Sequence, residues 1–224
     1  MAAPIRVDVW SDIACPWCYI GKRKLERGIE MFASSADAPP VEVVFHSYEL
    51  MPDTPVDFSG SAVDYLVEAK GIGRDQVQAM HEQITGVAAD VGLHYDFASQ
   101  KPANTRKAHE LLHLAAAQGR QMETKERLLS AHFEQGRDVG RDEELAALAV
   151  EVGLDRDDVL AALRDGTYRE AVGADIARAR ELGISGVPFF VLEGRYGISG
   201  AQQPETFRDA LTTVLEERSA GVGA

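Results

Sequence analysis

The sequence predicts an α/β fold in which a β-α-β unit and a β-β-α unit are separated by a large all-helical insertion. Strand-like alternation of apolar and polar residues occurs near both ends of the chain, and helical periodicity fills the segment between them. The 224 residues suffice for one large domain or for a domain with a sizeable insertion. We therefore expect residues 1–51 and 184–224 to form one α/β domain, and residues 52–183 to form a helical insertion domain.

Two strands and the helix between them make up the β-α-β unit. Apolar and polar residues alternate in residues 5–10 and again in residues 41–46, which is the periodicity of strands. A helix is expected over residues 16–32. Its first residue, Pro16, suits the start of a helix, because an N–H group at that position would have no partner within the helix. Two strands joined through a helix are expected to run parallel.

This first helix is expected to bury one face. Its two glycines, Gly21 and Gly28, would let the helix backbone come close to the sheet. The expected buried seam comprises Cys18, Gly21, Leu25, Gly28, Ile29 and Phe32. The charged residues are expected to form an exposed helix face rather than an anion site, and these are Lys22, Arg23, Lys24 and Arg27.

Helical periodicity continues through the insertion. Apolar residues recur there at three- and four-residue steps, and a glycine follows most of these runs, as expected at helix ends. Asn104 or Thr105 is expected to cap the third helix. The apolar runs that mark the expected helices lie in residues 62–69, 77–91, 108–115, 128–133, 145–152, 159–163 and 168–182.

The β-β-α unit follows the insertion. Residues 187–192 form an apolar strand pattern, residues 193–195 a turn, and residues 196–198 a short returning strand, which together predict a hairpin. Pro204 then opens a final helix. Its apolar face comprises Phe207, Leu211, Val214 and Leu215.

The two cysteines of the chain, Cys15 and Cys18, directly follow the first strand. Cys15 is expected at the helix N-terminus, with Cys18 one turn later on the same side. Unpaired N–H groups and the helix dipole favour an anion there, so we expect the pKa of Cys15 to lie below the reference value of about 8.5. Two cysteines give no structural disulfide framework. Half of a zinc site is the alternative, but the six histidines offer no recognisable second pair of ligands, so no metal is expected.

Five other residues are candidates for a role near the cysteines. Asp12 is expected to be a turn or cap residue, although a carboxylate near the second cysteine could act as a base. His46, at the end of a strand, could approach the site, and a hydrogen-bonded structural role is favoured. His109 and His113 are spaced like a metal-binding pair on a helix, but a structural role is favoured for them as well. Trp17 is expected to contact the substrate.

The order of elements, with Cys15-Pro16-Trp17-Cys18 after the first strand and Gly186-Val187-Pro188 before the third, resembles the thioredoxin superfamily. The helical insertion resembles that of its DsbA-like branch. Residues 11–21, 104–109 and 183–190 further resemble the FrnE-type dithiol-disulfide oxidoreductases, kin to hydroxychromene-carboxylate isomerases and kappa-class glutathione transferases. The resemblance implies a thioredoxin fold and a redox-active Cys15/Cys18 pair. It also implies a cis peptide bond before Pro188. The residues expected to support this pair are Asp12 and Pro16 in the motif, and Trp17, Val187 and Pro188 in substrate binding.

The expected function is therefore thiol-disulfide oxidoreductase or disulfide isomerase. A glutathione-dependent transferase or isomerase of the kappa and hydroxychromene-carboxylate isomerase type is the alternative. In that branch a hydroxyl usually replaces the first cysteine, so retention of both Cys15 and Cys18 favours dithiol chemistry. An inert binding module would be expected to have lost one cysteine. Thiol-disulfide exchange requires no metal, flavin or nicotinamide, and glutathione is a candidate redox partner.

The expected partners are proteins or small molecules that contain a thiol or a disulfide. The net charge of −13 argues against nucleic acid and anionic membranes. No apolar run approaches the roughly 18 residues that span a bilayer. The first residues show no apolar signal segment, so a cytoplasmic location is expected. Both a monomer and a homodimer are compatible with this sequence.

Overall fold

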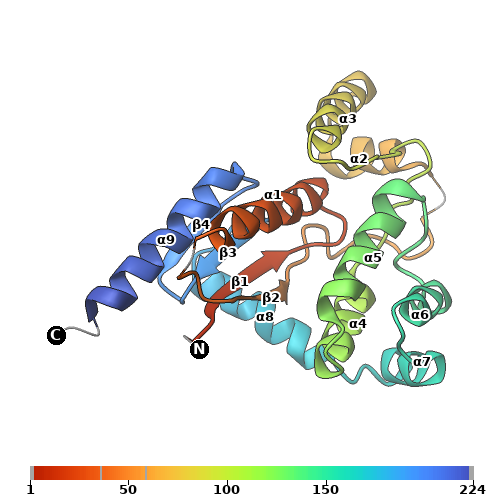
Figure 1. The fold of residues 1–224 in the computed structure, drawn as a ribbon. Coiled ribbons are helices and arrows are strands. Elements are labelled where there is room, and N and C mark those ends of the chain that lie inside the picture. The colour runs from red at the N-terminus through yellow and green to blue at the C-terminus, as the bar shows by residue number, and fades with distance from the viewer. Residues whose placement is uncertain (1–2, 36, 59, 222–224) are drawn as a thin grey trace.

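The structure, a computed structural model, describes residues 3–35, 37–58 and 60–221, and its centre is a four-stranded sheet within those residues (Figure 1). The strands are β1 (Ile5–Ser11), β2 (Val41–Ser47), β3 (Phe189–Leu192) and β4 (Tyr196–Ser199), in the spatial order β2-β1-β3-β4. β1 pairs in parallel with β2 and antiparallel with β3, which pairs antiparallel with β4. The predicted α/β fold with parallel first strands and a later hairpin is confirmed.

Helices α1 (Pro16–Ala33) and α9 (Pro204–Gly221) pack against each other and contribute to one hydrophobic core with the sheet (Figure 1). The contact between the two helices depends on Gly28. A Cβ atom added there would lie 2.6 Å from Phe207 Cβ and 2.7 Å from the carbonyl oxygen of Pro204. Gly28 therefore lets α1 approach α9, whereas Gly21 faces the start of β3.

The segment between β2 and β3 carries the predicted helices. A large core joins α4, α5, α6 and α7, and α2 packs on α3 beside it. The last helix of the segment, α8, covers the second face of the sheet, where Ala179 packs with Trp10 and Val191. These helices are α2 (Ala62–Lys70), α3 (Arg74–Ala89), α4 (Arg106–Ala117), α5 (Gln121–Glu134), α6 (Asp142–Glu151), α7 (Arg156–Asp165) and α8 (Arg169–Glu181).

The charged face predicted for α1 is partly wrong. Lys22 and Lys24 are buried, because α5 and the loop before α9 pack over them. Lys22 Nζ lies 2.6 Å from Glu126 Oε2, and Lys24 Nζ donates a hydrogen bond to the carbonyl oxygen of Ala201 at 3.2 Å. A lysine can place its long aliphatic stem in a core when its amino group still finds an acceptor.

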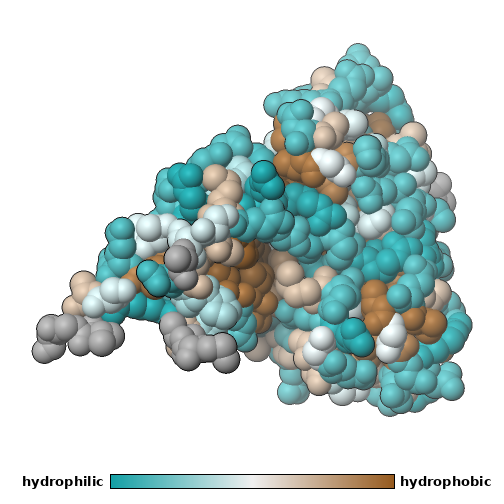
Figure 2. All heavy atoms as spheres, in the orientation of Figure 1, coloured by the Kyte–Doolittle hydropathy of each residue, from teal (hydrophilic) through white to brown (hydrophobic). Residues whose placement is uncertain are grey.

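Two element boundaries also differ from those predicted. The strand expected from residue 187 begins at Phe189. The helix expected at residues 128–133 begins seven residues earlier, at Gln121, because its first two turns carry polar residues on the buried face, including Lys125. Hydrophilic residues cover most of the molecular face shown in Figure 2, in keeping with the strongly negative charge. No helix in the described residues is both long and apolar enough to span a membrane.

A cluster of ion pairs joins the second face of the sheet to α4 and α8. His46 Nδ1 lies 2.8 Å from Asp175 Oδ1, and His46 Nε2 lies 2.7 Å from Asp8 Oδ1. His113 Nε2 lies 3.1 Å from the other oxygen of Asp175. The ring of His46 also stacks on Trp10, with 4.5 Å between centroids. His46 and His113 therefore have the structural contacts that the sequence favoured.

This cluster is expected to make stability depend on pH. Burial alone would lower the pKa of His46, but hydrogen bonds to Asp175 and Asp8 outweigh burial and raise it to about 9. The charged imidazole stabilises the fold fully below its unfolded pKa, about 6.5, and this stabilisation is lost as pH rises through the folded value. Urea unfolding should show a free-energy difference between the wild type and His46→Gln that shrinks from pH 6.5 to pH 9. A difference that stays constant over that range would contradict the assignment.

Candidate active site

The first turn of α1 brings the two cysteines together. Cys15 is the N-cap residue, with extended backbone angles (φ −95°, ψ 111°), and Pro16 is the first helical residue. The N–H of Cys18 donates to the carbonyl oxygen of Cys15 at 3.0 Å, which closes the turn. Both thiols are free in the described structure, and both are buried. This arrangement is the one that strand β1 followed by a proline-initiated helix predicts.

The segment before β3 lies directly against these cysteines. Cys15 Sγ donates to the carbonyl oxygen of Val187 at 3.6 Å, and the Val187–Pro188 peptide bond is cis. Gly21, one turn after Cys18, makes the close approach possible. A Cβ at Gly21 would lie 2.8 Å from Pro188 Cγ, closer than packed carbon atoms come. The structure therefore places Cys15, Cys18, Val187 and Pro188 in one site.

Asp12 is a buried anchor for the loop that leads to Cys15. Its carboxylate accepts the N–H of Leu50 at 2.7 Å, the N–H of Ala14 at 3.3 Å and His109 Nε2 at 3.3 Å. Burial alone would raise the pKa of Asp12, but the hydrogen bond to His109 and the charge of that ring outweigh burial, so the pKa lies below its usual value. Asp12 is thus a charged turn residue whose field reaches the thiols. His109 and His113 contact different carboxylates and do not form one site.

The ionisation of the thiols differs from the sequence prediction. The pKa of Cys15 is raised well above its ordinary value by the hydrogen bond to Cys18, by burial and by the negative charges of Cys18 and Asp12. Burial would also raise the pKa of Cys18, but the hydrogen bond to Cys15 and the positive charge of Lys125 outweigh it, so the pKa of Cys18 is lowered. The two thiols titrate as a coupled pair, in which Cys15 is the weaker acid and Cys18 the stronger one. The prediction of a low pKa for Cys15 is wrong because it considered the helix N-terminus alone.

Two residues of the site escaped the sequence analysis. The hydroxyl of Tyr95, in the loop after α3, donates to the carbonyl oxygen of Pro16 at 2.7 Å. Lys125 of α5 is fully buried. Its position offered a signal, because it precedes Leu128 and Leu129 by three and four residues and so lies on the apolar face of a helix. Nothing in the local sequence distinguishes Tyr95.

Exposed apolar side chains accompany the buried thiols. Trp17, between the cysteines, is 36% exposed, and Leu50, whose N–H binds Asp12, is 43% exposed. Large apolar side chains at the surface of a soluble protein often mark a contact surface. Within the described residues no group of three or more histidine, cysteine, aspartate or glutamate side chains is arranged to hold a metal ion.

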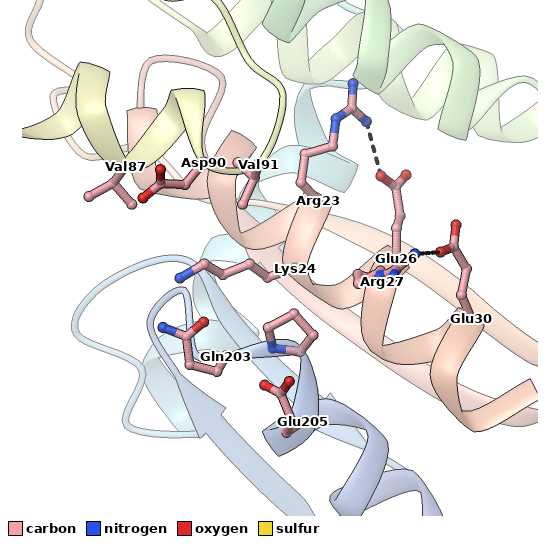
Figure 3. A pocket seen from close by; sticks show the side chains of 11 residues that line it. Arg23, Lys24, Glu26, Arg27, Glu30, Val87, Asp90, Val91, Gln203 and Glu205 are labelled. Atoms are coloured by element: carbon pink, nitrogen blue, oxygen red, sulfur yellow. Dashed lines mark hydrogen bonds and ion pairs between the residues drawn. The ribbon is translucent and has the colours of Figure 1, made fainter.

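A separate groove of about 710 Å³ lies between α1, the end of α3 and the start of α9 (Figure 3). Figure 3 shows Lys24 pointing between Asp90 and Gln203, with Glu205 below them. The side chains along the groove carry both signs of charge, and several are paired with each other, as Arg27 is with Glu30. The described residues that line the groove include none of the predicted site residues. The groove is therefore distinct from the cysteine site.

Several known proteins resemble this chain in sequence or in structure. The chain is 40% identical to a probable DsbA oxidoreductase from Streptomyces coelicolor, with a TM-score of 0.87 over 95% of this chain and 91% of that one. It is 27% identical to the uncharacterized protein YwbO of Bacillus subtilis over 93% of this chain and 96% of that one. The cytosolic disulfide reductase DsbM of Pseudomonas aeruginosa, solved with GSH, shares the fold at 18% identity, with a TM-score of 0.65 over 94% of this chain and 99% of that one.

The family assignment rests on most of the chain. Residues 6–212 match the DSBA-like thioredoxin domain, a span that includes both cysteines, the Val187–Pro188 segment and the helical insertion. The resemblance to the thioredoxin superfamily and its DsbA-like branch is confirmed, and the narrower FrnE-type assignment stays a prediction. The chain belongs to the family of DSBA-like thioredoxin domains.

Proposed function

We propose that the protein is a thiol-disulfide oxidoreductase or disulfide isomerase that uses Cys15 and Cys18 as its redox pair. One observation carries this proposal: two free thiols in a single helical turn lie against the backbone of Val187, with 3.6 Å between Cys15 Sγ and the carbonyl oxygen. Backbone groups beside a nucleophile can pair with an extended substrate, as an added strand does. The family assignment supports the same class of reaction.

The reaction would proceed by two exchanges. In the reduced protein, Cys15 holds a proton beside the negatively charged sulfur of Cys18, so Cys18 can accept that proton as Cys15 attacks. The bond from Cys15 to a substrate sulfur forms as the substrate disulfide breaks, and the released thiolate takes up the proton. Cys18, again a thiolate, then attacks Cys15 and releases the second substrate sulfur as a thiolate, which takes up a proton from the solvent. Two electrons pass to the substrate, and the pair becomes a disulfide. The reverse sequence oxidises a substrate dithiol.

The substrate would meet an apolar surface at this site. Trp17 and Leu50 are exposed near the thiols and suit apolar segments of an unfolded polypeptide. Glutathione remains a candidate partner that restores the redox state of the pair, and exchange of this kind requires no cofactor. A cytoplasmic location, as for the cytosolic Pseudomonas aeruginosa reductase, is part of the proposal.

Three assays on one preparation test this function against the glutathione-transferase alternative. We expect reduction of insulin by dithiothreitol, or reactivation of scrambled ribonuclease, to be accelerated, and conjugation of glutathione to an electrophile to stay at the uncatalysed rate. A protein in which both Cys15 and Cys18 are replaced by serine serves as the control for each assay. Conjugation without disulfide exchange would instead support the glutathione-transferase function. Inactivity in all three assays would reject both functions.

A further inference from the structure

Lys125 is a fully buried lysine on the inner face of α5. Among the described residues, no hydrogen-bond acceptor reaches its Nζ atom. Nζ instead lies 5.3 Å from the ring centroid of Phe45, on β2. Burying an unpaired ammonium group is costly, so a charged lysine in such a place needs a compensating negative charge nearby.

The surrounding contacts of α5 fix where Lys125 points. One turn earlier, the side chain of Gln121 binds the backbone of Phe45 through both of its groups, at 3.0 Å and 2.9 Å. One turn later, Leu129 packs with Tyr19 and Ile20 of α1 in one core cluster. α5 is thus anchored on β2 and on the turn of α1 that follows Cys18. Lys125 lies between these two anchors.

The charged groups that act electrostatically on Lys125 come from the loop after β1 and from α1. They are the sulfurs of Cys18 and Cys15, the carboxylate of Asp12 and, with the opposite sign, Lys22. Asp12 is already occupied by Leu50, Ala14 and His109. Cys18 is the first of the charges that favour a protonated Lys125. Asp12 stays charged in both redox states, so the thiolate of Cys18 is the negative partner of the buried ammonium group that depends on the redox state of the pair.

We propose that Lys125 is a positioning residue of the redox site: it holds the negative charge of the reduced pair on Cys18, so the helical insertion supplies part of the catalytic electrostatics. This inference rests on the proposed function. In the reduced protein Cys15 carries one proton and Lys125 another, next to the thiolate of Cys18. When the pair becomes a disulfide, the thiolate disappears and the ammonium loses the first of its negative neighbours. Both protons then leave together with the two electrons that pass to the substrate.

The site can release the second proton near neutral pH. Burial lowers the pKa of Lys125, and the neighbouring negative charges oppose this only in part, so its pKa is about 8. Removing the thiolate should lower it further. The electrostatic contact thus stabilises the reduced protein relative to the disulfide form, which makes the pair a stronger oxidant.

The test uses a protein with one cysteine. In a Cys15→Ser background, the ionisation of Cys18 is followed by the ultraviolet absorbance of its thiolate against pH. Lys125→Met is expected to raise the midpoint by about one pH unit, which is about a tenfold weaker acid. Lys125→Arg, which keeps the positive charge, should keep most of the low midpoint. With both cysteines present, Lys125→Met should also shift the equilibrium with glutathione about tenfold toward the disulfide form.

Lys24→Met is the matched control, because Lys24 of α1 is also a buried lysine, but it donates to the backbone carbonyl oxygen of Ala201, before α9. Its midpoint should equal that of Cys15→Ser alone. Lys125→Gln, which is uncharged but polar, replaces Lys125→Met if that variant does not fold, and the same shift is expected. An unchanged midpoint in the uncharged variant, or an equal shift in the Lys24 control, would overturn the inference. Because the titration needs no substrate, its result tests the role of Lys125 independently of the proposed function.

Discussion

Replacing Cys15 with serine is expected to abolish disulfide exchange, whereas replacing Cys18 with serine is expected to trap the protein in mixed disulfides. Cys15 contacts the backbone of Val187, where a substrate chain would lie, and so is placed to attack first. Without Cys18, the mixed disulfide has no internal thiol to resolve it. The losses should be large, because the nucleophile or the resolving thiol is gone rather than merely less reactive.

Non-reducing gels after incubation with a disulfide-containing protein distinguish the two variants. Adducts should accumulate with Cys18→Ser and should be absent with Cys15→Ser. Adducts should also disappear on addition of dithiothreitol. If Cys15→Ser formed the adducts and Cys18→Ser did not, the roles of the two cysteines would be reversed.

The second large effect is expected at Gly21, which has no side chain of its own. A side chain there must displace Pro188, because a Cβ would lie 2.8 Å from Pro188 Cγ and 3.3 Å from Phe190 Cζ. Gly21→Val is therefore expected to lower the free energy of unfolding by about 1–3 kcal/mol, the usual cost of overpacking. It should also move the Val187 backbone away from Cys15 and reduce exchange activity more than the stability loss explains.

Gly86→Val is the matched control for this substitution. Gly86 is also inside a helix, α3, and apart from its chain neighbours and the backbone of its own helix no described atom lies within 4 Å of the position that its Cβ would take. We expect stability to change there by no more than about 0.5 kcal/mol and activity to stay unchanged. Urea unfolding and insulin reduction measure both effects. Equal activity in Gly21→Val and the wild type would show that the approach of Pro188 does not matter for exchange.

Local patterns in the sequence were sufficient for the elements and for the position of the thiols. Strand alternation and Pro16 each act within a few residues, and the structure has β1 and α1 where they predict. Of the two glycines, Gly21 allows the predicted approach to the sheet, whereas the prediction for Gly28 is wrong, because it lets α1 approach α9 instead. The burial and the pKa values of the ionisable side chains were harder to predict. Burial of Lys22 depends on Glu126, more than a hundred residues away, and the high pKa of Cys15 depends on Asp12 and Cys18 acting together.

Lys125 is a second case in which the sequence indicates a residue but not its interaction partner. A lysine on an apolar helix face is visible in the sequence, but its partner is not. The partner follows from the way α5 crosses β2 and α1, and that crossing is set by contacts such as Gln121 with Phe45 and Leu129 with Tyr19. Packing between distant segments, the insertion and the sheet with α1, therefore determines the electrostatics of the site. The periodicity within either segment does not predict that packing.

The side chain of Gln121 has a further consequence for assembly. β2 is an outer strand of the sheet, and outer strands expose N–H and C=O groups that can recruit an extended chain, which leads to aggregation or strand exchange. Gln121 occupies the N–H and the C=O of Phe45 together, as a neighbouring strand would. A second polypeptide cannot add to β2 across Phe45 without displacing α5. The helix that contributes Lys125 therefore also protects this border of the sheet against unwanted self-association.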